Sequence, residues 1–234
     1  MAEREHPAKT PRHDGAGHRA RLRQRLLDQG GDALGDHEIV EYLLATAIPR
    51  RDTKPLAKRL LKEFGGFAQL VAADPAAIAR VDGAGDGVVA AIKIVEASAL
   101  RLLSSGLRDM PVLSGWQALL DYLRADMAHR STERVRVLHL NAKNRLLRDE
   151  VMSEGTIDQS AIYVREVLRR ALDIGSSAVI LVHNHPSGDP QPSRQDIAIT
   201  RELIEAGRKV GVAVHDHIVM AQGGHASMRA LGLI

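Results

Sequence analysis

The stretch VILVHNHPSGDPQPSRQD, residues 179–196, joins an apolar run to two histidines, a loop with three prolines and a Ser-x-x-Asp pattern. A short apolar run of this kind is typical of a buried strand. The prolines stiffen the loop that follows it. Ser193 and Asp196 form the pattern with which many helices begin. The stretch therefore predicts a strand, a stiff loop and a helix in succession.

Strands and helices also alternate around this stretch, from Ser114 to the end of the chain. Ser114 can cap a helix that continues to about Met127. Alternating or unbroken apolar runs predict strands, and apolar residues at helical spacing predict helices. In chain order we expect strands at 134–140 and 151–157, a helix at 161–175, a strand at 177–182, a helix at 193–211 and a strand at 212–220. Such a mixture predicts a three-layer or sandwich-like α/β domain over residues 114–234.

The N-terminal half has a different pattern. Between residues 19 and 106, apolar residues recur at helical spacing and are separated by Gly, Pro and Asp. We expect a small all-helical domain there, with helices at 22–29, 37–48, 53–64, 67–72, 75–81 and 87–103. Residues 107–113 are predicted to be a linker, and residues 1–18 a disordered basic tail.

Composition excludes several classes of protein. The chain has 44% hydrophobic and 26% charged residues and contains no apolar run long enough to span a membrane. The N-terminus lacks the apolar centre of a secretory signal, and there are no cysteines, so we expect a cytoplasmic protein. The absence of cysteine also means that any metal must be held by His, Asp or Glu.

The positive charge is concentrated at the N-terminus. Residues 1–25 contain seven Lys/Arg and three Asp/Glu, so 25 of the 32 basic and 26 of the 29 acidic residues remain for the rest of the chain. The body is therefore almost neutral. A broad electrostatic surface for DNA is not evident from composition, although a local patch could form.

His183 and His185 are candidate metal ligands. Because side chains alternate along a strand, both imidazoles point to one face and Asn184 points to the other. Asp196, in the first turn of the next helix, would be the third ligand. Two neutral histidines and one carboxylate suit Zn²⁺, and three protein ligands leave a fourth tetrahedral position for water, as in catalytic zinc sites.

The same residues permit a simpler interpretation. Ser193 and Asp196 would form a helix N-cap without any metal, and an H-x-H pattern at a strand end is a weak signal by itself. Helix capping and metal binding are also compatible, since helix geometry would aim both side chains. From these residues alone, a metal site and a capped helix after a strand both stay open.

A family resemblance adds to this pattern. Residues 183–196 read H-x-H, seven residues, Ser, two residues, Asp. This pattern resembles the JAMM signature of the MPN/JAB metalloprotease superfamily, and the HNHPSG form is similar to its bacterial RadC branch. EGTIDQSAIYVREVLRRAL at 154–172 and HDHIVM at 215–220 also resemble RadC segments. LLKEFGGFAQLVAADPAAIARVDGAG at 60–85 resembles the helical domain that precedes MPN in RadC proteins, so the resemblance covers about residues 19–234.

The resemblance implies an α+β chain in which a helix-hairpin-helix-like domain precedes an MPN/JAB (cytidine-deaminase-like) α/β domain. It implies that His183, His185 and Asp196 bind Zn²⁺ and that Ser193 supports the oxyanion of a tetrahedral intermediate. It also implies a glutamate near the start of an early strand as general base. Glu133 is the positional match, and Glu166 is the second choice.

Three other residues near these motifs need an interpretation. His215 and His217 form a second H-x-H that would share one strand face, but no carboxylate follows at ligand spacing. We therefore expect His217 to be structural or to support a ligand from behind. Arg165 matches the family pattern, and a role in binding a carboxylate is the alternative to an exposed helix arginine.

The glycine-rich segment VDGAGDGVVAAI, residues 81–92, resembles the turn of helix-hairpin-helix modules, in which backbone N–H groups hold DNA phosphates. Gly83 and Gly85 fit that pattern. Asp82 and Asp86 flank the turn, however, and their charge would oppose a phosphate. We favour a tight turn between packed helices over phosphate binding.

These observations favour a zinc-dependent hydrolase, a metallopeptidase or isopeptidase, that acts on a protein or peptide. The helical domain would recruit a partner or substrate. The alternative is a DNA-repair-associated nucleic-acid-binding module with little or no peptidase activity. Four chemically suited residues at these spacings favour the enzyme, because a scaffold does not need them.

Overall fold

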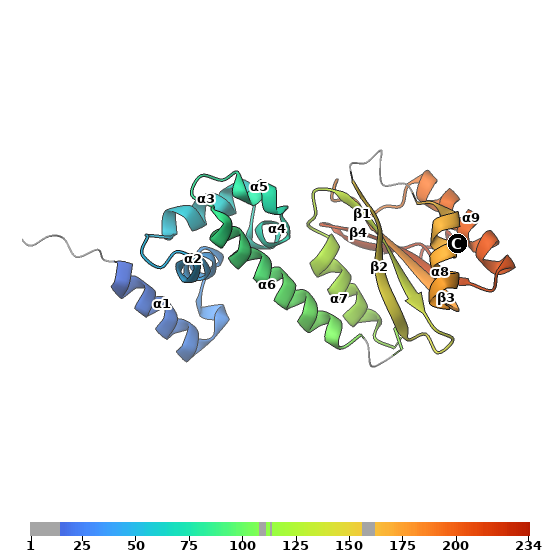
Figure 1. The fold of residues 1–234 in the computed structure, drawn as a ribbon, viewed down its shortest axis with the longest axis horizontal. Helices are drawn as coiled ribbons and strands as arrows, with labels where there is room; N and C mark the ends of the chain where they lie inside the picture. Colours follow the sequence, from blue (N-terminus) through green and yellow to red (C-terminus); the bar gives the residue numbers. More distant parts are fainter. Residues whose placement is uncertain (1–14, 108–110, 113, 156–161) are drawn as a thin grey trace, which may run out of the picture.

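The computed structural model describes residues 15–107, 111–112, 114–155 and 162–234, with the side chains from residue 17 onward in the first of these ranges (Figure 1). Helices make up the N-terminal part: α1 (Gly15–Gln29), a short 3₁₀ helix η1 (Gly31–Ala33), α2 (Asp36–Ala47), α3 (Lys54–Phe64), α4 (Phe67–Ala72), α5 (Pro75–Ala79) and α6 (Asp86–Ser105). The predicted tail is too long by four residues, because α1 begins at Gly15. Its first 14 residues lie outside the described part, as do 108–110 and 113 of the predicted linker.

The helical part has its own core, formed by apolar side chains of α2 to α6. Val40, Leu44, Leu60, Ile78 and Ile92 are each at most 1% exposed and belong to one buried cluster. The turn between α5 and α6 buries Ala84, and Gly85 is the N-cap residue of α6. Apolar residues at helical spacing thus produce a separate bundle, as the sequence pattern predicts.

The C-terminal part consists of α7 (Trp116–Met127), β1 (Glu133–Leu140), β2 (Leu146–Gly155), α8 (Val164–Ile174), β3 (Ala178–Asn184), α9 (Arg194–Lys209), β4 (Ala213–Ala221) and β5 (Gly224–Ser227). Gly115, and not Ser114, is the N-cap residue of α7, and no side chain caps this helix. β2 begins at Leu146, five residues before the predicted strand, whose last two residues lie outside the described part.

The five strands form one sheet in the order β2-β1-β3-β4-β5. β3 and β4 are parallel, and the other neighbouring pairs are antiparallel. α7 covers one face, where its buried leucines meet Leu138, Ile180 and Ile218 (Figure 1). α8 and α9 cover the other face, where Val167 and Leu203 belong to one buried cluster with Val137, Val179, Leu181 and Val214 of the strands. The predicted three-layer α/β arrangement is confirmed, with β3 buried along its whole length.

A buried ionic network joins α7 to β1 and β2. Arg136 pairs with Asp126 on α7, and its Nε and Nη2 donate to the Asp149 carboxylate at 2.8 and 2.9 Å. Asp126 also accepts from Arg130 at 2.9 Å, and Arg130 reaches Glu96 of α6 at 3.3 Å. Removing one member of such a network leaves a buried charge without its partner, at a cost of about 3–5 kcal/mol. The network therefore fixes β1 against α7 and links α7 to the helical part.

None of the helices in the described ranges is long and apolar enough to cross a lipid bilayer.

The C-terminal end of α9 packs closely against the segment that enters β4. A Cβ atom at Gly207 would lie 2.5 Å from the backbone oxygen of Val212, and the N–H of Val212 donates to the carbonyl of Gly207 at 2.9 Å. Only glycine permits this approach. Since α9 carries Asp196 at its other end, Gly207 helps to set the position of the whole helix against the sheet.

We predict that Gly207→Ala lowers the free energy of unfolding by about 1–3 kcal/mol, because backbone must move to admit the methyl group. Gly87→Ala is the matched control. Gly87 is exposed in the first turn of α6, and a Cβ there would lie 3.9 Å from its nearest neighbour, the oxygen of Ala47. That change should raise stability by up to about 1 kcal/mol. Equal effects of the two changes in urea unfolding would contradict the packing described for α9.

Candidate metal centre

The site begins where β3 ends. His183 is the last but one residue of the strand and is 1% exposed, and His185 follows the strand end. The N–H of His185 donates to the carbonyl of Met220 on β4 at 2.8 Å, so this residue is still held by the sheet. The chain then turns sharply. Gly188, with a φ of 88°, donates its N–H to the carbonyl of His185 at 3.1 Å.

Asp196 comes from the first turn of α9. Its Oδ2 accepts the backbone N–H of Ser193 at 2.7 Å, and its own N–H donates to the Ser193 Oγ at 3.1 Å. This reciprocal capping box satisfies two helix N–H groups and fixes the Asp196 carboxylate. The capping interpretation of the sequence is therefore correct, and it is the means by which Asp196 is aimed at the histidines.

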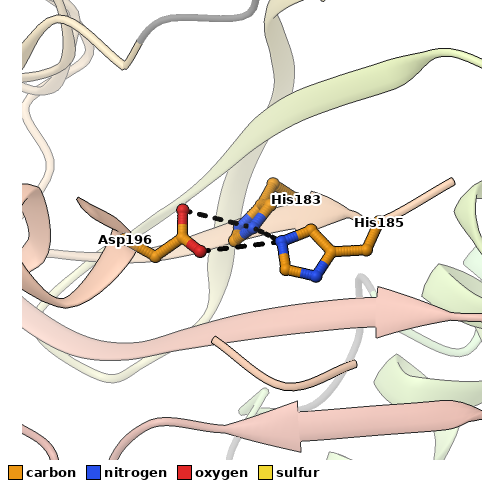
Figure 2. Close-up of side chains that lie close together, drawn as sticks. All are labelled: His183, His185 and Asp196. Carbon is orange, nitrogen blue, oxygen red and sulfur yellow. Dashed lines mark hydrogen bonds and ion pairs between the residues drawn. The ribbon is translucent and has the colours of Figure 1, made fainter. Parts of the chain in front are cut away.

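The three side chains converge on one point (Figure 2). The Nε2 atoms of His183 and His185 lie 2.9 Å apart. Asp196 Oδ1 lies 3.5 Å from His183 Nε2, and Asp196 Oδ2 lies 3.6 Å from His185 Nε2. Ligands about 2.0–2.1 Å from a tetrahedral zinc ion would be about 3.3 Å from one another. The three distances lie on both sides of that value, so the donor atoms fit Zn²⁺ in both chemistry and spacing.

The other ring nitrogen of each histidine is occupied. His185 Nδ1 lies 2.9 Å from the carbonyl oxygen of Asp189, and His183 Nδ1 lies 2.7 Å from His217 Nε2. A carbonyl can only accept, so His185 carries its proton on Nδ1 and presents the lone pair of Nε2. Such partners orient metal-binding histidines and set their tautomer.

His217 is fully buried behind His183 and has a second partner of its own. Its Nδ1 lies 2.6 Å from the Thr200 Oγ, which also donates to the Asp196 carbonyl at 2.5 Å. Because a hydroxyl has one proton, Thr200 accepts from the Nδ1–H of His217. His217 Nε2 is then an acceptor, and His183 must donate to it from Nδ1. This chain of hydrogen bonds leaves His183 Nε2 as a lone-pair donor toward Asp196.

The pKa shifts at the site show where positive charge is favoured. Burial holds the pKa of His217 well below its ordinary value, so the ring is neutral. Burial alone would raise the pKa of Asp196, but contacts with His183 and His185 hold it far below the usual range. The same contact with Asp196 raises the pKa of His185. A neutral His217 behind the cluster and an ionised Asp196 carboxylate within it favour positive charge at this point, which a divalent ion would supply.

Glu133 is the first residue of β1. Val135 pairs with His183 across the β1–β3 ladder, so Glu133, two residues earlier, lies on the same face of the sheet as His183. Burial raises the pKa of the Glu133 carboxyl, the positive potential of His183 and His185 opposes that shift, and Asp196 adds to it. Glu133 thus shares the electrostatic environment of the three candidate ligands.

Ser193 lies beside the cluster as the cap of α9. Its Oγ acts as acceptor in the capping box, so its hydroxyl proton is not used by the cap. The residue is exposed, which lets a substrate reach that proton.

The alternatives from the sequence have other surroundings. Glu166 accepts from Arg169 at 2.9 Å and pairs with Arg165 at 3.2 Å, and the hydrogen bond from Arg169 lowers the pKa of its carboxyl. The Arg165 side chain is 91% exposed. Both residues lie on the solvent side of α8, and Arg165 has the surroundings of an exposed helix arginine.

His215 and His217 do not share a strand face, which corrects the sequence-based expectation. Val214 pairs with Val179 and Asp216 pairs with Ile180, so His215 is the extra residue of a β-bulge. Its Nε2 contacts the Asn144 Oδ1 at 2.7 Å, away from the cluster. His217 alone faces His183.

Several groups at the site could not be predicted from the sequence pattern. Thr200 is one turn beyond Asp196 on α9. A buried threonine on a helix does not by itself indicate a role at a site. The Asp189 carbonyl is a backbone group, which sequence patterns do not report. The H-D-H segment of β4 signals His217, but the bulge that separates it from His215 is not visible in the residues.

The glycine-rich hairpin of the helical part is a tight turn. Gly83 has a φ of 89°, which favours glycine. The Asp82 side chain is 93% exposed and pairs with Arg59 of α3 at 3.1 Å. An exposed carboxylate at the turn agrees with the structural interpretation of this segment.

Known proteins resemble the chain in both parts. Residues 113–233 match the model of the RadC-like JAB domain, and residues 16–90 match the model of the UPF0758 N-terminal domain. A UPF0758 protein of Rhodobacter capsulatus is 51% identical over 213 residues, which cover 91% of this chain and all of that protein. Both domain matches follow the chain order of the two structural parts, and the His-His-Asp cluster lies inside the second of them, so this chain belongs to the RadC-like JAB family.

Proposed function

We propose that this chain is a zinc-dependent hydrolase of the JAMM type that cleaves a peptide or isopeptide bond. The observation that carries the proposal is the convergence of His183, His185 and Asp196, whose ligand atoms all lie within 4.8 Å of one another. Membership of a JAB family supports the same reaction class. When bound, Zn²⁺ would supply Lewis acidity and make a water molecule acidic enough to serve as nucleophile near neutral pH.

The chain's own residues would divide the remaining work. Glu133 would accept a proton at its carboxylate and deliver it to the leaving amine, a role for which a raised pKa is useful. The Ser193 hydroxyl would donate to the developing oxyanion, since the helix cap uses only its oxygen. Thr200 and His217 would hold the His183 ring in the tautomer that binds the ion.

The substrate class can be tested with a library that contains linear peptides and isopeptide-linked peptides, assayed with the zinc-loaded chain. Hydrolysis of either class supports the proposal. DNA binding is measured in parallel at several salt concentrations. No hydrolysis, together with salt-sensitive DNA binding that survives loss of zinc, would favour a nucleic-acid-binding module instead.

We predict that His185→Ala weakens zinc binding by more than about 100-fold, because changes behind a ligand already cost 10- to 100-fold. Zinc affinity is measured by competition with a chelator. His215→Ala is the matched control on the neighbouring strand, and it should bind zinc as the wild type does. Equal affinity in wild type and His185→Ala would refute the ligand assignment.

Thr200→Val should weaken zinc binding by about 10- to 100-fold without touching a ligand. The change keeps the shape of the side chain and leaves the buried Nδ1–H of His217 without its acceptor. His217 can then turn or change tautomer, and His183 loses a fixed partner. Unchanged zinc affinity in this variant would show that the hydrogen bonds behind His183 do not support the site.

Glu133→Gln should retain zinc and lower kcat by about 10²- to 10⁴-fold, since an amide cannot accept and deliver the proton. Glu166→Gln is the control at the second candidate, and its activity should equal that of the wild type. The reverse result, with the larger loss in Glu166→Gln, would move the general base to α8.

A further inference from the structure

The backbone pairing between β1 and β3 ends at the candidate metal centre. Their last paired residues are Val135 and His183. β3 continues to pair with β4 as far as Asn184, whereas β1 continues to Glu133 beside β2. The end of β1 that carries Glu133 therefore has no backbone pairing with β3, the strand that carries His183.

The side chain of Asn184 takes over where this pairing stops. Its Oδ1 accepts the backbone N–H of Arg134 at 2.8 Å, and its Nδ2 donates to the backbone carbonyl of Thr132 at 3.0 Å. These two groups belong to the peptide units on either side of Glu133. In a strand, the carbonyl of one residue and the N–H of the second residue after it point to the same side. One carboxamide thus replaces the peptide partner that β3 would otherwise provide.

The burial of Asn184 and the chemistry of its two partners fit this role. It is 1% exposed, so its amide must find both partners inside the protein. The carbonyl of Thr132 can only accept and the N–H of Arg134 can only donate, which fixes the orientation of the amide. Asn184 also lies between the two histidines in sequence, so a single rigid unit carries both imidazoles and the clamp on β1.

From these contacts we infer that Asn184 is a positioning residue that holds Glu133 at the metal centre. The inference rests on the proposed role of Glu133 as general base. Fixing the peptide units on both sides restricts the backbone of Glu133 and directs its carboxylate to the face that His183 shares. Asn184 touches neither ion nor substrate, and its effect on catalysis passes through Glu133.

The test combines a structural readout with a kinetic one. In Asn184→Ala, and in the similarly sized Asn184→Leu in case the first variant is unstable, the Arg134 N–H loses its acceptor, so its hydrogen exchange should accelerate by at least about tenfold. The exchange of the Val135 and Val137 amides should not change. Asn141→Ala is the matched control, because the Asn141 Oδ1 accepts from the N–H groups of Lys143 and Arg145 at the other end of β1.

The kinetic readout separates positioning from a general structural role. Both Asn184 variants should keep the zinc affinity of the wild type and lower kcat by about 10- to 100-fold, because small displacements of a catalytic group have effects of that size. In the Glu133→Gln background, Asn184→Ala should cause no further loss, since its effect acts through the missing carboxylate.

Three results would overturn the inference: unchanged exchange at Arg134, loss of zinc in both variants, or a loss in kcat that adds fully to that of Glu133→Gln. Failure of the proposed function gives a different pattern, in which the wild type hydrolyses no substrate of the library or Glu133→Gln is as active as the wild type. The exchange measurement needs neither substrate nor activity, so it judges the clamp in either case.

Discussion

Alternation of side chains along β3 is the constraint on which the site depends. Successive side chains of a strand point to opposite faces of the sheet. His183 therefore lies on the face covered by α8 and α9, and the Asn184 side chain does not. His183 thereby meets His217 and Asp196 from the elements packed on that face. A shift of one residue in the β3 register would exchange the two roles and dismantle the cluster. The fully buried apolar run before His183 makes such a shift costly, since it would turn the packed faces over.

Other elements of the domain hold the residues of the site in position against β3. α9 brings its capped first turn to the histidines, and Gly207 lets its far end close on the start of β4. The ionic network around Arg136 anchors β1, whose first residue is Glu133, against α7. Buried networks of this kind stabilise little in comparison with an apolar core, but breaking them is expensive. α9 and the ionic network of β1 therefore give the site a rigid support on two sides. Reacting groups need such a support to be held in one geometry.

Much of this could be predicted from the sequence. Periodicity separates the helical part from the α/β part, and the H-x-H and Ser-x-x-Asp spacings identify His183, His185 and Asp196 as a group. Three features could not be predicted. The bulge at His215 depends on how β4 pairs with β3, which local pattern does not encode. The contacts of Thr200 and Asn184 join residues 17 and 50 positions apart in the chain, so only the fold brings them together. β5 (Gly224–Ser227) is only four residues long, which is too short for a pattern of burial to identify it as a strand.

We propose that His183, His185 and Asp196 hold one zinc ion and leave one coordination position open. X-ray absorption at the zinc edge of the wild-type chain tests it most directly, because the method reports the atoms around the ion itself. We expect nitrogen and oxygen neighbours at about 2.0–2.1 Å, with outer scattering from two imidazole rings. A first shell of oxygen alone, or outer scattering from no imidazole or from three, would contradict it.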